Sequence, residues 1–170
     1  MSTLKADSLL RLNGTVHTRF AEYAIICDQK GDTTSGGTFT TGDWRTRDLN
    51  TEIEDADSIV AISSNQFVLG VGTYLIKASA PAYGVLRHVA KLYNATASSD
   101  VQVGTSEVSH NTYRSVTRSF VQARVVLTVE TIFEIRHNGG TTKATSGFGL
   151  AHNISGVNNV YTVVEIYKEV

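Results

Sequence analysis

The side chains that could carry out acid–base, nucleophilic or metal chemistry are few and widely spaced. No two histidines stand two or four positions apart, the spacing at which one strand or helix offers paired metal ligands. The five are His17, His88, His110, His137 and His152. Cys27 is the only cysteine, and its apolar run predicts a buried hydrophobic side chain. There is no Gly-x-Ser-x-Gly motif and no phosphate-binding glycine loop.

One acidic run and two arginine-rich segments remain as candidates for binding. Residues 52–57 hold four carboxylates, which hard cations favour, but the spacing is not that of an EF-hand loop. We interpret the run as a solvated turn and leave open whether a metal ion binds there. The arginines of segments 45–47 and 114–124 could bind anionic glycans or phosphates. The simpler interpretation is ion pairing, within or between subunits, with Asp48, Glu107 and Glu130. We therefore expect no enzyme and no cofactor.

Composition favours a β-protein with balanced charge. Val, Ile and Thr make up 50 of the 170 residues, and β-branched side chains suit a pleated sheet better than a helix. The 15 basic and 16 acidic residues leave a net charge of −1, which disfavours nucleic-acid binding and electrostatic attachment to membranes. No apolar window is long enough to span a bilayer, so we expect no membrane insertion.

Alternating apolar and polar residues predict about nine or ten short strands. Buried or alternating runs cover residues 22–27, 59–62, 66–69, 74–80, 86–93, 101–108, 121–136 and 160–167. Residues 63–65 read as a hairpin turn, and a tight turn near residues 130–131 divides the longest run. So many strands with almost no helix need two packed sheets to protect their edges. The fold class is therefore all-β, an antiparallel jelly-roll β-sandwich formed by residues 21–170.

The first 20 residues differ from the rest and are predicted to form an extended N-terminal arm. Their apolar residues fit neither the helical nor the strand period, and Asn13 and Gly14 form a turn signal. We expect the arm to pack on something other than its own domain. The apolar residues that would make this contact are Leu4, Leu9, Leu10 and Leu12.

Several motifs within residues 21–170 resemble a known family. They are segments 42–51, 62–67, 72–74, 78–83, 147–150 and 160–168. Together they resemble the complement-one-q globular head and tumour-necrosis-factor-like jelly roll, as found in virion proteins of bacteriophages. The family's aromatic motif has five residues between its Phe and Gly-x-Tyr, whereas here four residues separate Phe67 from Gly72. Ile76 and Ala78 stand in place of its later aromatic residues, so the animal ligand branch is disfavoured.

A second resemblance concerns the arm. Residues 1–9, with the Asn-Gly-Thr turn at residues 13–15, are similar to the N-terminal attachment segments of phage tail-fibre and appendage proteins. Together the two resemblances imply a homotrimeric structural protein of a virion. The arm would anchor it to other virion proteins of the tail or capsid, and the jelly-roll head would project outward.

The role expected first is a short tail-fibre or receptor-binding appendage that touches a host surface glycan or protein. Beside an intracellular β-sandwich binding module with no viral role, two alternatives stay open. One is a capsid decoration protein that clamps shell subunits. The other is a lectin-like or glycan-processing domain, for which Glu107 and Glu134 are candidate carboxylates. The side chains predicted to contact a neighbouring subunit or an outside partner are Trp44, Arg45, Arg47, Tyr83, Tyr113 and Arg114.

Overall fold

A computed structural model describes residues 20–169, which form strands and no helix. Twelve strands are assigned in this part of the chain. They are β1 (Phe20–Lys30), β2 (Arg45–Thr46), β3 (Thr51–Glu54), β4 (Val60–Ser63), β5 (Gln66–Leu69), β6 (Gly72–Tyr83), β7 (Leu86–Asn94), β8 (Ser99–Val103), β9 (Glu107–Ser109), β10 (Val116–Leu127), β11 (Thr131–Gly139) and β12 (Asn159–Glu169). None of the described residues forms a helix that could cross a membrane.

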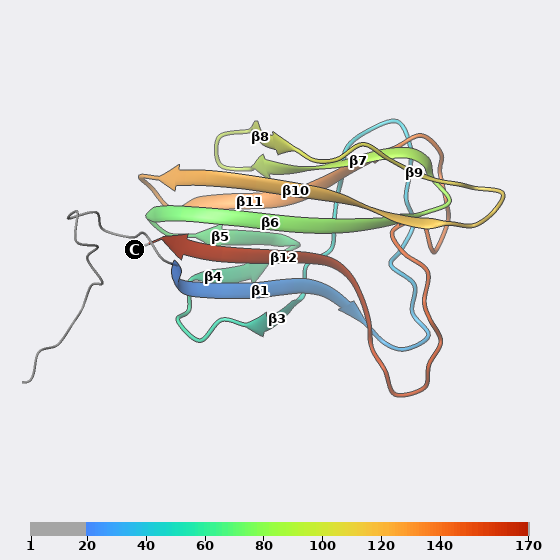
Figure 1. The fold of residues 1–170 in the computed structure, drawn as a ribbon, viewed down its shortest axis with the longest axis horizontal. Helices are drawn as coiled ribbons and strands as arrows, with labels where there is room; N and C mark the ends of the chain where they lie inside the picture. The colour runs from blue at the N-terminus through green and yellow to red at the C-terminus, as the bar shows by residue number, and fades with distance from the viewer. Residues whose placement is uncertain (1–19, 170) are drawn as a thin grey trace, which may run out of the picture.

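The strands pack as two antiparallel sheets, one in front of the other in Figure 1. The five-stranded sheet has the order β10-β6-β12-β1-β3. The seven-stranded sheet has the order β4-β5-β11-β7-β8, with β2 beside β11 and β9 beside β7. The chain crosses between the sheets several times, among them from β5 to β6, from β6 to β7, from β9 to β10 and from β10 to β11. This arrangement confirms the all-β jelly-roll sandwich that the sequence predicts.

The core lies between the sheets and is formed by the alternate residues of the long strands whose side chains point inward. Phe67 of β5 and Phe133 of β11 are fully buried and stack with ring centroids 5.5 Å apart. Facing them from the other sheet are Ile26, Ile76 and Ile166. Burying each such side chain contributes about 1.5–3 kcal/mol, so the apolar cluster between the sheets is a main source of the stability of the sandwich.

Local turn chemistry explains where several strands end. Ser64 and Asn65 both have positive φ, as a two-residue hairpin turn between twisted strands requires, which confirms the predicted β4–β5 hairpin. The long alternating run divides after Leu127, close to the predicted turn. The predicted single strand at residues 101–108 is wrong in one respect, because Gly104 interrupts it and leaves β8 and β9 as separate strands. An added Cβ at Gly104 would meet Phe120 O of β10 at 2.5 Å, so only glycine fits there.

Both ends of the described chain lie at the same end of the sandwich. Phe20 pairs with Glu169, and Figure 1 shows β1 beginning and β12 ending on the left. The predicted contact residues Leu4, Leu9, Leu10 and Leu12 lie outside the described residues. The opposite end holds the β9–β10 turn and the loops after β1 and β11, where Gly156 N donates to Asp32 Oδ2.

Candidate self-association surface and buried polar network

The side of the five-stranded sheet that faces away from the core carries apolar and aromatic side chains; we call it the outer face. Cross-strand pairing aligns these side chains in rows, because directly paired residues point to the same side. One row joins Phe120, Ser79 and Val163 across β10, β6 and β12. Another joins Leu75, Tyr167 and Tyr23 across β6, β12 and β1. A polar row of Gln122, Lys77 and Glu165 lies between them, so the outer face mixes apolar and charged groups, as surfaces that contact other proteins commonly do.

The outer face is also shaped and ordered. The rings of Tyr23 and Tyr167 stack at 6.4 Å, and Lys77 Nζ lies 5.4 Å from the centre of the Tyr167 ring. A hollow of about 290 Å³ opens beside Phe120 and Val163. Phe120 remains 51% exposed on the edge strand β10 although it is a large apolar residue. A fixed hollow next to an exposed phenylalanine is a geometry that a neighbouring protein surface can fill.

The outer side of the seven-stranded sheet differs, because charged groups cover its aromatic rings. Lys91 Nζ lies 3.9 Å from the centre of the Trp44 ring, and Arg136 Cζ lies 3.4 Å from that of Tyr93. Lys91 also pairs with Asp100 at 2.6 Å. Lys91 is itself only 5% exposed, whereas the side chain of Arg136 is partly exposed and stays hydrated at a water-facing surface. Burying Arg136 and Asp100 in an interface would require their desolvation. This side therefore suits solvent better than a dry interface.

Glu134, a candidate carboxylate for glycan processing, is occupied by three donors. Arg136 Nε donates at 2.7 Å, Gln66 Nε2 at 2.6 Å and Thr46 Oγ1 at 3.0 Å. Burial alone would raise the pKa of Glu134, but these hydrogen bonds outweigh it and hold the pKa below its ordinary value. A general acid needs the opposite shift, so Glu134 is structurally engaged and poorly suited to protonate a leaving group.

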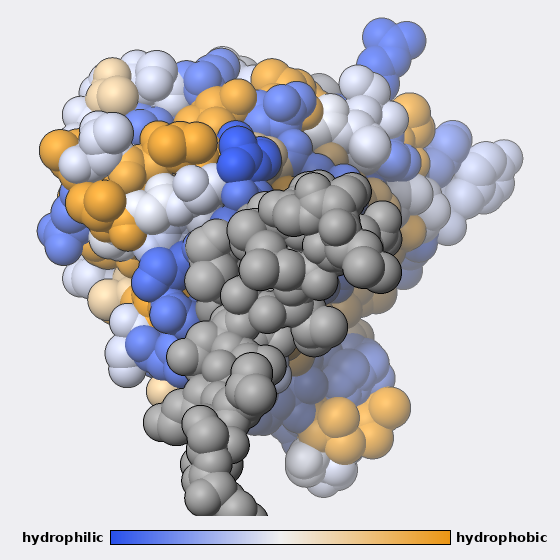
Figure 2. All heavy atoms as spheres, turned by 60° about the vertical axis from the view of Figure 1, so that its left-hand side comes forward, coloured by the Kyte–Doolittle hydropathy of each residue, from blue (hydrophilic) through white to orange (hydrophobic). Residues whose placement is uncertain are grey.

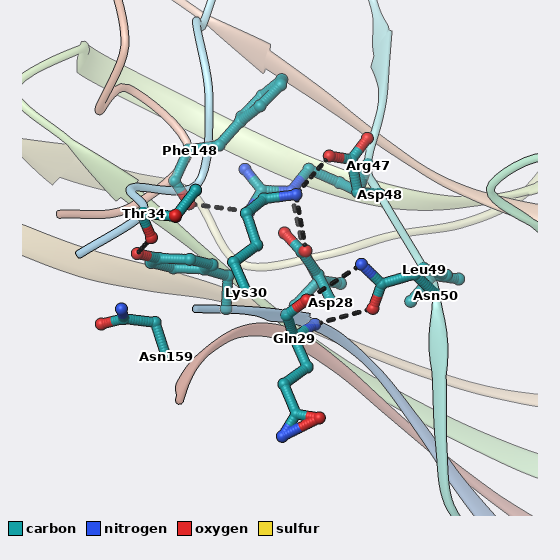
Figure 3. A network of polar contacts seen from close by, with 12 residues as sticks. Asp28, Gln29, Lys30, Thr34, Arg47, Asp48, Leu49, Asn50, Phe148 and Asn159 are labelled. Atoms are coloured by element: carbon teal, nitrogen blue, oxygen red, sulfur yellow. Dashed lines mark hydrogen bonds and ion pairs between the residues drawn. The ribbon is translucent and has the colours of Figure 1, made fainter. Parts of the chain in front are cut away.

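Arg47 is fully buried at the point where the β6–β12 ladder ends (Figure 3). The ladder stops at the Ser79–Val163 pair, two residues before Pro81, which has no N–H to donate. The guanidinium fills the gap. Its Nη1 donates to Pro81 O at 3.1 Å, Nη2 to Phe148 O at 2.8 Å and Nε to Thr162 Oγ1 at 2.8 Å. Arg47 thereby satisfies three buried acceptors beside the end of the ladder, two of them main-chain carbonyls.

The predicted surface role of Arg47 does not agree with this position, because no part of the side chain reaches the molecular surface. Arginine is usually exposed, and nothing local in the sequence marks this one as interior. Burial lowers the pKa of Arg47 to about 9, which still leaves the guanidinium charged at neutral pH. Its charge is balanced at longer range by Asp28 and Asp48.

Lys30 links those two carboxylates, as Figure 3 shows. Its Nζ lies 2.7 Å from Asp48 Oδ2 and 2.9 Å from Asp28 Oδ1. Neither oxygen of buried Asp28 accepts a hydrogen bond of good geometry, and desolvation raises the pKa of this carboxyl although Lys30 opposes the shift. The predicted pairing of Asp48 with a nearby arginine is therefore wrong. Arg124, from the other segment, pairs with Glu169 at 2.7 Å, which was not among the predicted partners.

Two histidines that are far apart in the sequence meet inside the sandwich. His88 Nδ1 of β7 lies 3.0 Å from His137 Nε2 of β11, and His88 Nε2 lies 2.8 Å from Thr117 Oγ1 of β10. The pair therefore bridges the two sheets. Burial lowers the pKa of His88 to about 4 and that of His137 well below its ordinary value, with Arg47 adding to both shifts. Both rings are neutral at pH 7, and His137 Nδ1 is buried without a hydrogen-bond partner.

The other predicted contact residues are dispersed. Trp44 and Arg45 lie partly exposed on β2 and the residue before it, and Arg45 Nε donates to Thr40 O at 3.0 Å. Tyr83 is buried at the end of β6, so it too cannot contact a partner directly. Tyr113 is 83% exposed and Arg114 has a φ of 54°, both in the β9–β10 turn at the end away from Phe20. The structure does not gather these residues into one site.

Sequence reasoning missed Phe120 and the two histidines as residues of interest. Phe120 stands out of phase with the inward residues of its strand, so strict alternation could have marked it as an exposed aromatic. Nothing local signals the histidine pair. Among residues 20–169, no group of three or more His, Cys, Asp or Glu side chains is arranged to hold a metal ion. Cys27 is buried as predicted, and burial raises the pKa of its thiol.

Three solved structures show what the fold resembles. The globular domain of zebrafish complement 1qA protein matches with a TM-score of 0.53 at 14% identity, over 86% of this chain and 96% of that chain. Murine APRIL matches with a TM-score of 0.52 at 8% identity, over 86% and 98%. PRD1 vertex protein P5 matches with a TM-score of 0.50 at 12% identity, over 88% and 98%.

These likenesses confirm the complement-one-q and tumour-necrosis-factor-like jelly-roll fold that the sequence motifs indicate. One of the similar structures is a viral protein, and none of the three names denotes an enzyme. No protein-family model matches the chain, and no curated protein sequence does. At identities this low, the comparison concerns the fold, and the function must be argued from surfaces.

Proposed function

We propose that this chain, which has the jelly-roll fold of complement-one-q heads and tumour-necrosis-factor-like ligands, is a homotrimeric structural protein of a virus particle. It works by packing and surface recognition. The observation that carries the proposal is the contrast between the two sides of the sandwich. The outer face presents Phe120, Val163 and the stacked Tyr23 and Tyr167 beside Lys77 and Glu165, whereas Lys91 and Arg136 lie closer over the rings of the opposite side.

Self-association through the outer face would remove this apolar surface from water. A stable interface buries at least about 1,000 Å², which a sheet face of five strands can supply. Closed cyclic assembly also protects the exposed edges of the sheet without leaving a template for aggregation. Threefold symmetry is favoured by the resemblance to a trimeric family.

Sedimentation of the full chain tests the assembly. We expect about three times the chain mass of 18.4 kDa at micromolar concentration. Replacing Phe120 by aspartate places a carboxylate in the proposed contact, so we expect the mass to fall toward that of one chain while the β-sheet circular-dichroism spectrum is kept. Val103→Asp, at an equally exposed apolar position on β8, is the matched control and should remain trimeric. A wild-type monomer would rule out the trimer.

The end of the sandwich that carries Phe20 and Glu169 is where the arm joins the head, and it also presents apolar side chains. Figure 2 is turned toward this end and shows orange apolar atoms on its upper part. The β5–β6 and β10–β11 turns lie side by side here, since Leu127 pairs with Gly72 and Thr131 with Leu69. Exposed apolar residues in or next to these turns are Val71, Val126 and Val129. This end is suited to face the particle.

Removing residues 1–19 tests the anchoring role while leaving β1 whole. We expect the shortened chain to fold and to trimerise as the full chain does, because the sheet pairing begins at Phe20. We also expect it to be absent from purified particles when it is supplied in place of the full chain, as measured by immunoblotting of particle fractions. Particles that still take up the shortened chain would show that the arm is not the anchor.

The finer role that we propose first is an appendage whose distal end contacts a host surface. Exposed Tyr113 and Ile154 lie in the loops at the end away from the arm, where a receptor could reach them. A shell-bound decoration protein is the second candidate, favoured by the likeness to a vertex protein. Gold-labelled antibody on intact particles, seen by electron microscopy, separates a tail location from one spread over the shell.

A further inference from the structure

Arg118 of β10 is a cation that the described chain does not neutralise. Its Nη1 donates to Ser79 Oγ and to Tyr161 O, each at 2.9 Å, which fixes the guanidinium on the outer face. No carboxylate among residues 20–169 forms an ion pair with it. All the hydrogen bonds found for this side chain come from Nη1. Nε and Nη2, the two nitrogens that together can hold both oxygens of one carboxylate, remain available.

The surroundings of Arg118 indicate what kind of group would pair with it. The guanidinium lines a hollow of about 170 Å³, whose rim includes Val116, Leu150 and Val160. These three side chains are 40–50% exposed although they are apolar. A partly buried cation ringed by exposed apolar groups matches a protein contact that brings a carboxylate and excludes water around it. A small free anion would leave the apolar rim wet.

The two edges of the five-stranded sheet carry charges of opposite sign. β10 holds Arg118 and Arg124, the second already paired with Glu169, and no carboxylate. β3, at the far edge, holds Glu52 and Glu54 and no cation. Neither glutamate forms an ion pair within the described residues. Each edge also exposes a large apolar side chain, Phe120 on β10 and Ile53 on β3. The edges therefore carry opposite charge, and Glu54, which pairs with the outward Ile25, lies on the same side of the sheet as Arg118.

A threefold ring joins two unlike surfaces at each contact, because each subunit offers one patch to one neighbour and a different patch to the other. We infer that the basic edge of one subunit, at Arg118, meets the acidic edge of the next copy, at Glu52 and Glu54. This inference rests on the self-association proposed above. It specifies which edges of the sheet are in contact. It also gives the acidic run at residues 52–57 a partner, the basic edge of a second copy of the chain.

Charge reversal on the full-length chain tests the contact. R118E places like charges at the subunit boundary, and so does the double change E52K/E54K. We expect each to raise the concentration at half dissociation of the trimer at least about ten-fold, measured by sedimentation at several loading concentrations. Combining all three changes restores opposite charges, and we expect the value to return to within about three-fold of wild type. R87E, an exposed arginine on β7 of the other sheet, is the control and should not shift it.

Circular dichroism confirms that each variant is folded before its assembly is compared. If wild-type chain and R118E dissociate at the same concentration, the inference is wrong and the trimer stands. If both reversed variants dissociate but the combination does not recover, the two edges do not meet, which also overturns the inference. A wild-type chain that is monomeric at every concentration contradicts the proposed function instead.

Discussion

Replacing Arg47 by methionine is expected to lower the free energy of unfolding by about 3–5 kcal/mol. Methionine keeps much of the side-chain volume, so the loss reports polar interactions more than a cavity. Three buried acceptors, on Pro81, Phe148 and Thr162, lose their donor, and each buried group left unsatisfied costs about 1–3 kcal/mol. Buried Asp28 also loses a compensating positive charge.

Urea unfolding at a fixed protein concentration measures this effect, since the stability of an oligomer depends on concentration. Arg45→Met is the matched control two residues away, because Arg45 is partly exposed and bonds only loop carbonyls. We expect that change to cost less than about 1 kcal/mol. Lysine at position 47 should rescue little, since one ammonium group cannot reproduce three diverging hydrogen bonds. Equal midpoints for the two methionine variants would show that the Arg47 network is not a main source of stability.

Acidification from pH 6.5 to pH 4 is expected to destabilise the fold through the buried histidine pair. The pKa of His88 falls from 6.5 to about 4 on folding, because burial disfavours the charged ring. The unfolded chain therefore binds a proton in this window that the folded chain does not. The contribution of neutral His88 to the free energy of unfolding is fully present above pH 6.5. It is lost as the pH falls toward 4, and the loss from His88 alone is roughly 3 kcal/mol. Burial also lowers the pKa of His137, so this residue adds to the loss of stability toward acid.

Comparing wild type with His88→Gln across this window isolates the pair. Glutamine retains a donor and an acceptor between Thr117 and His137 but does not titrate, so we expect a shallower loss of stability toward acid. Asp28, whose pKa is raised by burial, acts in the opposite direction and is common to both proteins. Ile135→Val, next to the pair on β11, should cost about 1 kcal/mol at every pH and keep the wild-type slope. Parallel slopes for wild type and His88→Gln would contradict the assignment.

Much of the fold could be predicted from local patterns. Strict alternation along β7 and β10 places each side chain on one face or the other, because strand geometry repeats every two residues. The β4–β5 hairpin follows from Ser64 and Asn65, since hairpin turns need residues that tolerate positive φ. The burial of Cys27 follows from its apolar neighbours. In each case the physical cause acts over a few neighbouring residues, so a short stretch of sequence is enough to predict the feature.

The functional surfaces depend instead on which strands become neighbours. Arg47 lies in the interior at the point where the β6–β12 ladder ends before Pro81. His88 meets His137, 49 residues later in the chain, because β7 pairs with β11. The unlike charges of β10 and β3 form opposite edges only through the sheet order. Alternation states which face a side chain takes, whereas its partner on that face is set by long-range pairing. Such pairing reflects the summed burial of the whole sandwich, and no short segment encodes it.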